Sequence, residues 1–432
     1  MIQRIAAAVL TLSFLAQTGF ASVIADFDGE LAGLAAAVPA APEPARADLA
    51  NPGTKALAEW TIMVFSNAKN DLEKYLIDDM NEMELVGSTD KVNVVVELGR
   101  MAGYDASDGD WTGVRRYLVT RDSDMTRLAS RKLADLGMAD MGDYRSLADF
   151  GKWAKQAYPA KRYMLIIENH GSGWEKDVRH GRADRGISYD EQSGSHINTP
   201  QLALALKEMG KVDVFGTDAC LMQMAEVVYE IKDYAGYIVG SEETEPGDGY
   251  TYNDFLGPVV SNPAMGALEL GKQAVNAYAD HYDGIRQAYT QSLVVPAKAE
   301  KLLALTNAFA AAVMATTSDQ QAILYARRYA VNFAVSENRD LHDFTRLLVE
   351  KTGSAEVKRT GRELMSFLTD ELVAQNRARD KAANSYSDAK NYTNAKGIAA
   401  YFPESQLGAG YQELAWAKAS QWDEFVMWIN RL

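Results

Sequence analysis

Residues 163–168, Tyr-Met-Leu-Ile-Ile-Glu, predict a buried β-strand that ends directly before Asn169-His170-Gly171. A short apolar run without alternation is typical of a strand covered on both faces. A second such strand, residues 212–216, ends just before Thr217-Asp218-Ala219-Cys220. In parallel sheets ligands bind beyond the carboxyl ends of the strands. We therefore expect His170 and Cys220 at the same rim of one sheet.

Strands and helices alternate on either side of these stretches. Alternation of this kind predicts βαβ units, hence an α/β fold with a mostly parallel sheet flanked by helices. Further strands are expected at 60–66, 92–98, 115–120 and 237–240, and helices at 71–86, 146–158, 200–209 and 221–234. Long amphipathic helices are expected at 268–282, 296–314 and 357–378, so residues 261–432 form a largely helical C-terminal region that completes the α/β domain of residues 57–260.

The N-terminus has the pattern of a secretory signal. Arg4 precedes an apolar run, residues 5–15, and Gly19-Phe20-Ala21 offers a cleavage site after Ala21. The run is too short for a spanning helix, which makes an uncleaved anchor the weaker alternative. Residues 1–21 therefore predict a signal peptide and an exported protein, periplasmic or secreted. Residues 22–56 are rich in Ala and Pro and are expected to be a linker or a propeptide, with both alternatives open.

The composition limits the classes of function. The 432 residues include one cysteine, Cys220, so neither an internal disulfide nor a thiolate-rich metal site can form. The net charge of −15 argues against nucleic acid or an anionic membrane as a partner. No His-Glu-x-x-His motif is present, which disfavours a zinc site. No stable membrane insertion is expected after signal cleavage, and the negative charge permits a preference for cationic substrates.

Cys220 and His170 are the candidates for catalysis. A lone Cys at a strand end is a candidate nucleophile, and the predicted helix from residue 221 would lower the pKa of its thiol through the helix dipole. His170, fifty residues earlier, would exchange protons with the thiol and the leaving group. The backbone N–H groups of Gly171 and Cys220 would form an oxyanion hole. The alternative is a buried, inert Cys. Ser172 lacks the surrounding Gly-x-Ser-x-Gly pattern and is the weaker nucleophile.

Several motifs resemble those of the clostripain family of cysteine peptidases. The resemblance is carried by Asn169-His170-Gly171-Ser172-Gly173-Trp174 and by Asp218-Ala219-Cys220-Leu221-Met222. Weaker similarity covers Asn70-Asp71-Leu72-Glu73, the acidic segment 241–247 and Tyr401-Phe402-Pro403, so that it extends over residues 58–405. The resemblance implies a caspase-like sheet, shared with gingipains and legumains, and a Cys–His dyad formed by Cys220 and His170.

The resemblance also implies a substrate preference. It suggests a secreted endopeptidase that cuts after Arg or Lys, with Asp218 as the acidic residue of the S1 pocket and Asp248 as a second candidate. Asp218 has an alternative role as a helix cap. Asp248, Glu242, Glu243 and Glu245 are expected either to face solvent or to serve as pocket rim or calcium ligands. The chemistry needs no cofactor, calcium is left open, and the metal ligands are unknown.

Members of the family are often self-processed after the His motif, which implies a cut in the loop 175–196. Four basic residues in this loop are candidates: Lys176, Arg179, Arg182 and Arg185. The sequence departs from the family at Lys69 and at Leu98-Gly99-Arg100, and these departures weaken the expectation of calcium more than that of the dyad. Two other functions stay open: a catalytically silent envelope binding protein on the same scaffold, and a cysteine peptidase of this fold with a non-basic P1 preference.

Overall fold

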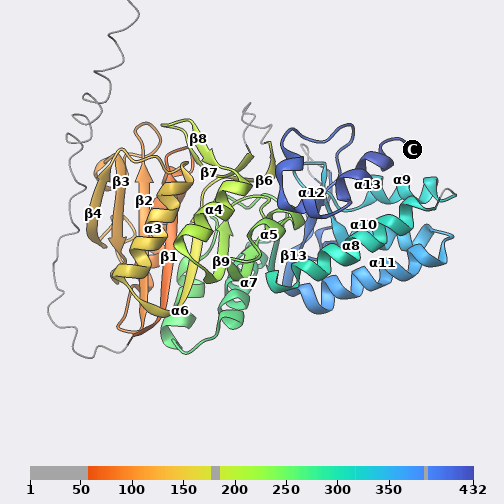
Figure 1. Cartoon of the computed structure of the whole chain (residues 1–432). Coiled ribbons are helices and arrows are strands. Elements are labelled where there is room, and N and C mark those ends of the chain that lie inside the picture. Colours follow the sequence, from red (N-terminus) through yellow and green to blue (C-terminus); the bar gives the residue numbers. More distant parts are fainter. Residues whose placement is uncertain (1–56, 177–184, 317, 384–387) are drawn as a thin grey trace, which may run out of the picture. The chain divides into compact units, whose positions relative to one another are not determined.

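A nine-stranded sheet organises the chain in the computed structural model, which describes residues 57–176, 185–316, 318–383 and 388–432. The strand order is β13-β11-β10-β9-β5-β1-β2-β3-β4 (Figure 1). The strands are β1 (Ala58–Ala68), β2 (Val92–Arg100), β3 (Gly113–Leu118), β4 (Arg131–Gly137), β5 (Ala160–Glu168), β9 (Val212–Asp218), β10 (Ala235–Gly240), β11 (Tyr289–Val294) and β13 (Val373–Arg379). The predicted signal peptide and linker lie outside the described residues.

The centre of the sheet is parallel and its edges are antiparallel. Strands β10, β9, β5, β1 and β2 pair in parallel, whereas β3, β4, β11 and β13 join through antiparallel pairs. The central strands are buried on both faces, which is why they read as continuous apolar runs in the sequence. The prediction of an α/β fold with a mainly parallel sheet flanked by helices is confirmed.

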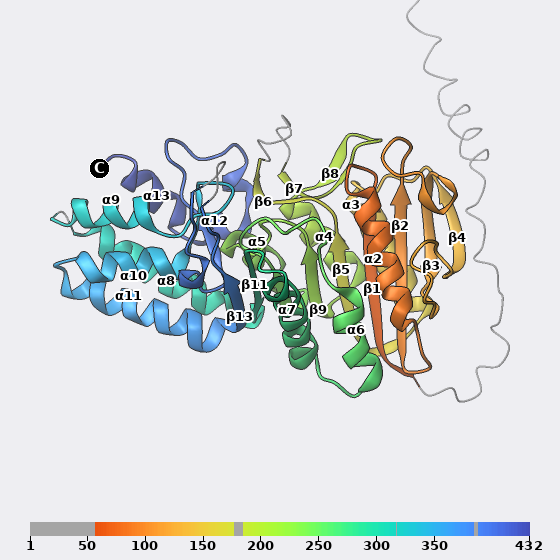
Figure 2. The ribbon, with the colours of Figure 1, turned by 180° about the vertical axis from the view of Figure 1, so that it is seen from behind.

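Helices cover both faces of the sheet. One face packs against α3 (Tyr144–Ala157), α4 (Thr199–Met209) and α5 (Ala225–Ile231) (Figure 1). The opposite face packs against α2 (Glu73–Val86), α6 (Tyr252–Ser261) and α7 (Ala267–Gly284) (Figure 2). Alternate residues of β1 divide between two cores: Met63 and Phe65 belong to the first, and Ile62 and Val64 to the second. This alternation fixes the register of the central strands, because a slip of one residue would exchange the two sets.

A small three-stranded sheet follows β5 directly. It consists of β6 (Gly171–Lys176), β7 (Arg185–Asp190) and β8 (Ser195–Ile197). It begins at Gly171, the residue after His170, and thus rises from the rim of the main sheet. The polar segment 175–196 of the sequence therefore contributes ordered strands on both sides of the residues that are not described.

Residues beyond 260 supply both helices and strands. The helices are α8 (Ala299–Met314), α9 (Gln320–Tyr329), α10 (Leu341–Lys351), α11 (Ala355–Phe367), α12 (Ala415–Ala419) and α13 (Trp422–Ile429), and β12 (Asn338–Asp340) pairs with β14 (Ala399–Tyr401). The predicted helix 357–378 is wrong at its C-terminal end, because a π-helical turn, Leu368–Leu372, follows Phe367 and β13 then pairs with β11. Pairing at a sheet edge outweighs the local helix propensity there. No helix among the described residues has both the length and the apolar character to cross a membrane.

Candidate active site

The register of two neighbouring strands places His170 and Cys220 at the same rim. β5 and β9 are adjacent and parallel, and their last residues, Glu168 and Asp218, lie directly opposite each other. His170 and Cys220 each follow two residues later. Both line a single cleft of about 840 Å³. The two residues that were expected at one rim from their positions after strand ends therefore line the same cavity.

Segments from distant parts of the sequence enclose this cleft. Its lining comes from α2 and the segment 244–249, and from the segments 334–337 and 404–409 of the C-terminal region. Trp174 also lines the cleft, and its ring centroid lies 4.7 Å from those of Tyr401 and Tyr411 in edge-on contacts. The C-terminal region thus shapes the cleft directly.

Cys220 is half-buried, and its sulfur accepts a hydrogen bond from the backbone N–H of Glu245 at 3.3 Å. The prediction that a helix starts at residue 221 is wrong. Leu221 has a φ of 64°, a left-handed conformation that does not continue into a helix, and α5 starts only at Ala225 and is 7 residues long. The helix dipole therefore does not act on the thiol as expected. The Glu245 N–H takes its place as a backbone donor to the sulfur.

His170 contacts a carboxylate that sequence reasoning missed. Its Nε2 lies 2.7 Å from Oδ1 of Asp71, whose side chain is 53% exposed. In the sequence, Asp71 stands at the start of the predicted helix 71–86 and within the family-like motif 70–73, and neither position assigns it a catalytic role. β1 pairs in parallel with β5, with Ser66 opposite Glu168, so the residues after β1 reach the same rim. The strand-end rule applied to β1 would have singled out Asp71.

Gly171 lies against the backbone of Cys220. A Cβ at position 171 would stand 2.4 Å from the carbonyl oxygen of Cys220 and 3.1 Å from its nitrogen. Only glycine permits this approach. Ser172 is buried, and its hydroxyl lies 2.7 Å from that of Tyr189 and accepts the N–H of Gly186 at 3.0 Å. These contacts give Ser172 a structural role within the small sheet.

Asp218 is buried at the floor of the cleft. Its Oδ2 accepts hydrogen bonds from the backbone N–H of Tyr250 at 3.0 Å and from the Tyr252 hydroxyl at 3.2 Å. Burial raises the pKa of Asp218, and the donors from Tyr250 and Tyr252 partly offset that rise. Asp218 caps no helix, because α5 begins at Ala225. Its side chain instead connects the end of β9 to the segment before α6.

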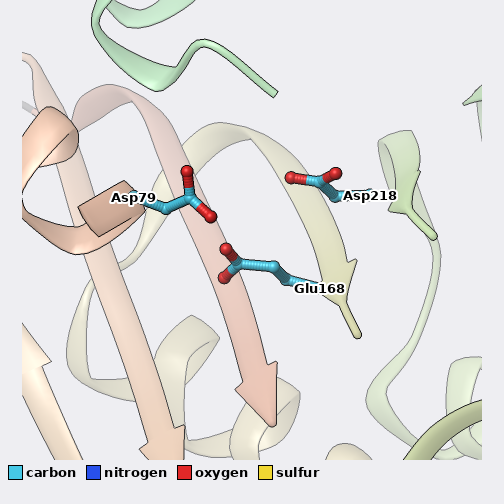
Figure 3. Close-up of side chains that lie close together, drawn as sticks. All are labelled: Asp79, Glu168 and Asp218. Atoms are coloured by element: carbon cyan, nitrogen blue, oxygen red, sulfur yellow. The ribbon is translucent and has the colours of Figure 1, made fainter. Parts of the chain in front are cut away.

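Two further carboxylates, absent from the sequence predictions, converge on Asp218. Asp79 comes from α2 and Glu168 from the end of β5, and a carboxylate oxygen of each residue lies within 4.8 Å of the others (Figure 3). All three side chains are buried and line the cleft. Burial raises the pKa of Glu168 to about 8, and raises that of Asp79 well above its usual range.

The other acidic residues singled out in the sequence do not form one cluster: the three glutamates bond to separate partners, and the aspartate is exposed. The Glu242 carboxylate accepts the N–H of Gly397, that of Glu243 accepts the N–H groups of Thr244 and Ala334, and that of Glu245 accepts the Gln291 amide. Asp248 is exposed and is not among the residues that line the cleft. Within the described part of the chain, the residues that could jointly hold a metal ion are Asp79, Glu168 and Asp218.

The basic residues expected in the loop after His170 fall at its edges or outside the description. Lys176 ends β6 and Arg185 begins β7, and these two residues are register partners across the antiparallel pair. Arg179 and Arg182 lie outside the described residues. The chain therefore leaves and re-enters the small sheet at facing positions.

The chain is similar to known proteins in sequence and in fold. The sequence profile of the Clostripain family matches residues 64–428. Clostripain of Hathewaya histolytica is 27% identical over 215 residues, and the match covers 45% of this chain and 40% of that protein.

Two solved structures share the fold. The secreted C11 cysteine protease of Bacteroides thetaiotaomicron, in complex with an irreversible peptide inhibitor, superposes with a TM-score of 0.63 at 18% identity, covering 85% of this chain and 100% of that one. An inactive zymogen C11 protease from Parabacteroides distasonis also gives 0.63, at 17% identity, covering 85% and 99%. With the family profile matched over most of its length, the chain belongs to the clostripain family of cysteine peptidases.

Proposed function

We propose that this protein is an exported cysteine endopeptidase that hydrolyses peptide bonds after Arg or Lys. The observation that carries the proposal is the position of His170 and Cys220 at the ends of adjacent parallel strands, in a cleft whose floor is acidic. Export is supported by the signal-like pattern of residues 1–21.

In the proposed mechanism, Cys220 Sγ is the nucleophile and His170 its proton-exchange partner. The thiolate attacks the scissile carbonyl carbon and forms a C–S bond, and the C–N bond then breaks as His170 gives a proton to the leaving amine, which leaves a thioester on Cys220. Water then attacks the thioester carbon and releases the carboxylic acid and the thiol. The N–H of Glu245 favours the thiolate, since a hydrogen bond to the charged form stabilises it.

Asp71 is assigned a positioning role in this mechanism. Its carboxylate is bonded to Nε2 of His170, so proton exchange with Cys220 and the leaving group falls to Nδ1. A carboxylate in that place also stabilises the imidazolium that forms in the reaction. The N–H groups of Gly171 and Cys220 are proposed as the oxyanion hole, which is supported by the close approach of their backbones.

The preference for a basic P1 residue is proposed from the buried carboxylate of Asp218. A carboxylate on the cleft floor would pair with a guanidinium or an ammonium group in a charge-assisted contact. Asp248 is kept as the second candidate for this pocket, although it is exposed and is not among the residues that line the cleft.

The test is cleavage of fluorogenic peptides with Arg, Lys, Ala or Asn at P1. Wild type should cleave the Arg and Lys peptides, Cys220→Ala and His170→Ala should be inactive, and all proteins should have matching circular dichroism spectra. Equal activity of wild type and Cys220→Ala would exclude the dyad. A preference for Ala or Asn would retain the peptidase and exclude the basic pocket.

Self-processing between Lys176 and Arg185 is a separate part of the proposal. A cut between register partners would leave both β6 and β7 in the small sheet. Incubated wild type should therefore yield two fragments that stay associated, with a new N-terminus between residues 177 and 186. Cys220→Ala should remain intact, and an intact wild-type chain that cleaves peptides would exclude self-processing.

A further inference from the structure

Three buried acidic side chains meet on the cleft floor without a cationic partner in the described residues. Asp79, Glu168 and Asp218 are 4%, 1% and 6% exposed, and a carboxylate oxygen of each lies within 4.8 Å of the others. No lysine or arginine among the residues that the structure describes takes part in an ion pair with any of them. Buried carboxylates without a counter-charge are strongly disfavoured, so this floor requires either bound protons or an external cation.

The three carboxylates differ in the donors that already occupy them. Asp218 accepts two protein hydrogen bonds and shares a third with the Glu245 carboxyl group. Glu168 differs, because both of its buried oxygens lack a well-formed hydrogen bond from the described residues. Its close polar neighbours are the carboxyl group of Asp79 and the hydroxyl of Ser66. Both carboxylate oxygens of Glu168 can therefore accept hydrogen bonds from an incoming ligand.

The side chain of Glu168 points towards the other two carboxylates. Figure 3 shows the three side chains gathered together, with the carboxylate of Glu168 extending towards Asp79, which comes from α2, and with Asp218 of the neighbouring strand on the other side. All three line the same cleft as Cys220. Glu168 and Asp218 each precede a dyad residue by two positions, at the very ends of β5 and β9. A long side chain held at the dyad would therefore bring its terminal cation down to this floor.

We infer that Glu168, supported by Asp79, is a further acceptor for the cationic P1 side chain beside Asp218, which also anchors the segment before α6. This inference rests on the proposed preference for basic residues and deepens it. The physical reason is that an incoming ammonium or guanidinium supplies the donors and the positive charge that Glu168 lacks. Asp218 contributes its charge but has its Oδ2 held by Tyr250 and Tyr252.

Glu168→Gln is the test, because it removes the charge and keeps the shape. KM for Arg and Lys substrates should rise about 10- to 100-fold, as expected for loss of a charge-assisted contact. The kcat at saturation, and KM for an uncharged P1 citrulline substrate, should change less than about threefold. Asp79→Asn should act in the same direction with a smaller effect.

Glu226→Gln is the matched control. Glu226 is as buried as Glu168 but lies outside the cleft, where its Oε1 accepts the Tyr401 N–H and the Tyr411 hydroxyl at 3.0 Å each. KM for basic substrates should be unchanged in this variant. The Tm of Glu168→Gln should be no lower than that of wild type, since the substitution removes repulsion among buried carboxylates. Misfolding is therefore separable from loss of recognition.

A binding measurement makes the inference independent of turnover. Calorimetry on full-length Cys220→Ala should detect agmatine, a small guanidinium compound, and the added substitution Glu168→Gln should abolish its binding. If wild type fails to cleave basic substrates, the proposed function is wrong, but calorimetry still shows whether the three carboxylates bind a guanidinium group. If wild type cleaves them and Glu168→Gln alters neither KM nor agmatine binding, the inference is overturned and the function stands.

A divalent cation is the competing occupant of the floor. Addition of CaCl₂ should at most displace agmatine. Calcium binding that Glu168→Gln abolishes, together with an unchanged KM for basic substrates, would assign the floor to a metal ion and overturn the inference.

Discussion

At the scale of single residues, the proposed role of Asp71 is to orient His170. Asp71→Asn keeps a polar group near Nε2 but removes the carboxylate that faces it at 2.7 Å. Because Asp71 is 53% exposed, water screens the pair and the effect should be moderate. We expect kcat to fall about tenfold, with KM unchanged, since the interaction serves the chemistry rather than binding.

Steady-state kinetics on Asp71→Asn, Asp71→Glu and Asp78→Ala checks this role. Asp78 is a similarly exposed acid of α2 that pairs with Lys74 away from the cleft, so its loss should leave kcat unchanged. Asp71→Glu should recover part of the rate. A rise in KM for Asp71→Asn at constant kcat would instead assign Asp71 to substrate binding.

Gly171 is a second residue whose substitution has a defined physical result. Gly171→Ala would put a methyl group 2.4 Å from the Cys220 carbonyl oxygen, and backbone cannot move aside as a flexible side chain can. We expect a destabilisation of about 1–3 kcal/mol from overpacking, and a loss of kcat of about 100-fold if the proposed oxyanion hole is displaced.

The control for Gly171→Ala is Gly257→Ala in α6. A Cβ at position 257 meets no atom within 4 Å, so the substitution should leave activity intact and stabilise by about 0.4–1 kcal/mol. Urea unfolding measures the change in stability of both variants, and peptide cleavage measures the change in their kcat. Full activity in Gly171→Ala would show that the backbone approach has no part in catalysis.

At the scale of elements, the segment 241–249 supplies the stabilisation of the Cys220 thiolate that was expected from a helix dipole. It presents the Glu245 N–H to the Cys220 sulfur, and it is fixed by Glu243, which accepts the Ala334 N–H at 3.0 Å and the Tyr392 hydroxyl. Tyr392→Phe removes that hydroxyl and leaves a buried carboxylate oxygen with one donor fewer. We expect a destabilisation of about 1.5–3 kcal/mol and a slower alkylation of Cys220 by iodoacetamide.

Alkylation rates and unfolding free energies, measured on the same preparations, test this link. Tyr325→Phe is the control, because Tyr325 is exposed on α9 and is not among the residues that line the cleft. Loss of stability in Tyr392→Phe without any change in the alkylation rate would separate the anchoring of this segment from the state of the thiol.

The same scale explains what the sequence could predict. The buried strands around residues 163–168 and 212–216 were evident, because burial on both faces produces unbroken apolar runs. The start of α5 was not, since apolar residues continue through Leu221 and Met222 while the left-handed φ of Leu221 depends on its tertiary setting. Glu168 and Asp79 were missed because their convergence requires the register of β5 with β9 and the packing of α2, neither of which is local.

At the scale of the whole molecule, several buried carboxyl groups make stability depend on pH. Burial raises the pKa of Glu168 to about 8, and those of Glu82, Glu226 and Asp340 to about 7. In the unfolded chain such groups titrate near 4. Between these limits the folded state binds more protons than the unfolded state. The free energy of unfolding should therefore be greatest at the acidic end of this window and should fall as the pH rises from about 5 to about 8.

Thermal unfolding of Cys220→Ala, which avoids self-digestion, tests the sign of this dependence. Tm should be higher at pH 5.5 than at pH 8. Glu226→Gln removes one titrating group but keeps an acceptor for the Tyr401 N–H and the Tyr411 hydroxyl, so the slope should flatten by up to about 1.4 kcal/mol per pH unit. Glu356→Gln, which changes an exposed acid paired with Arg359, should leave the slope unchanged in this window. A Tm that rises with pH between 5.5 and 8 would mean that these carboxyl groups are ionised in the folded protein, and that cations hold them so.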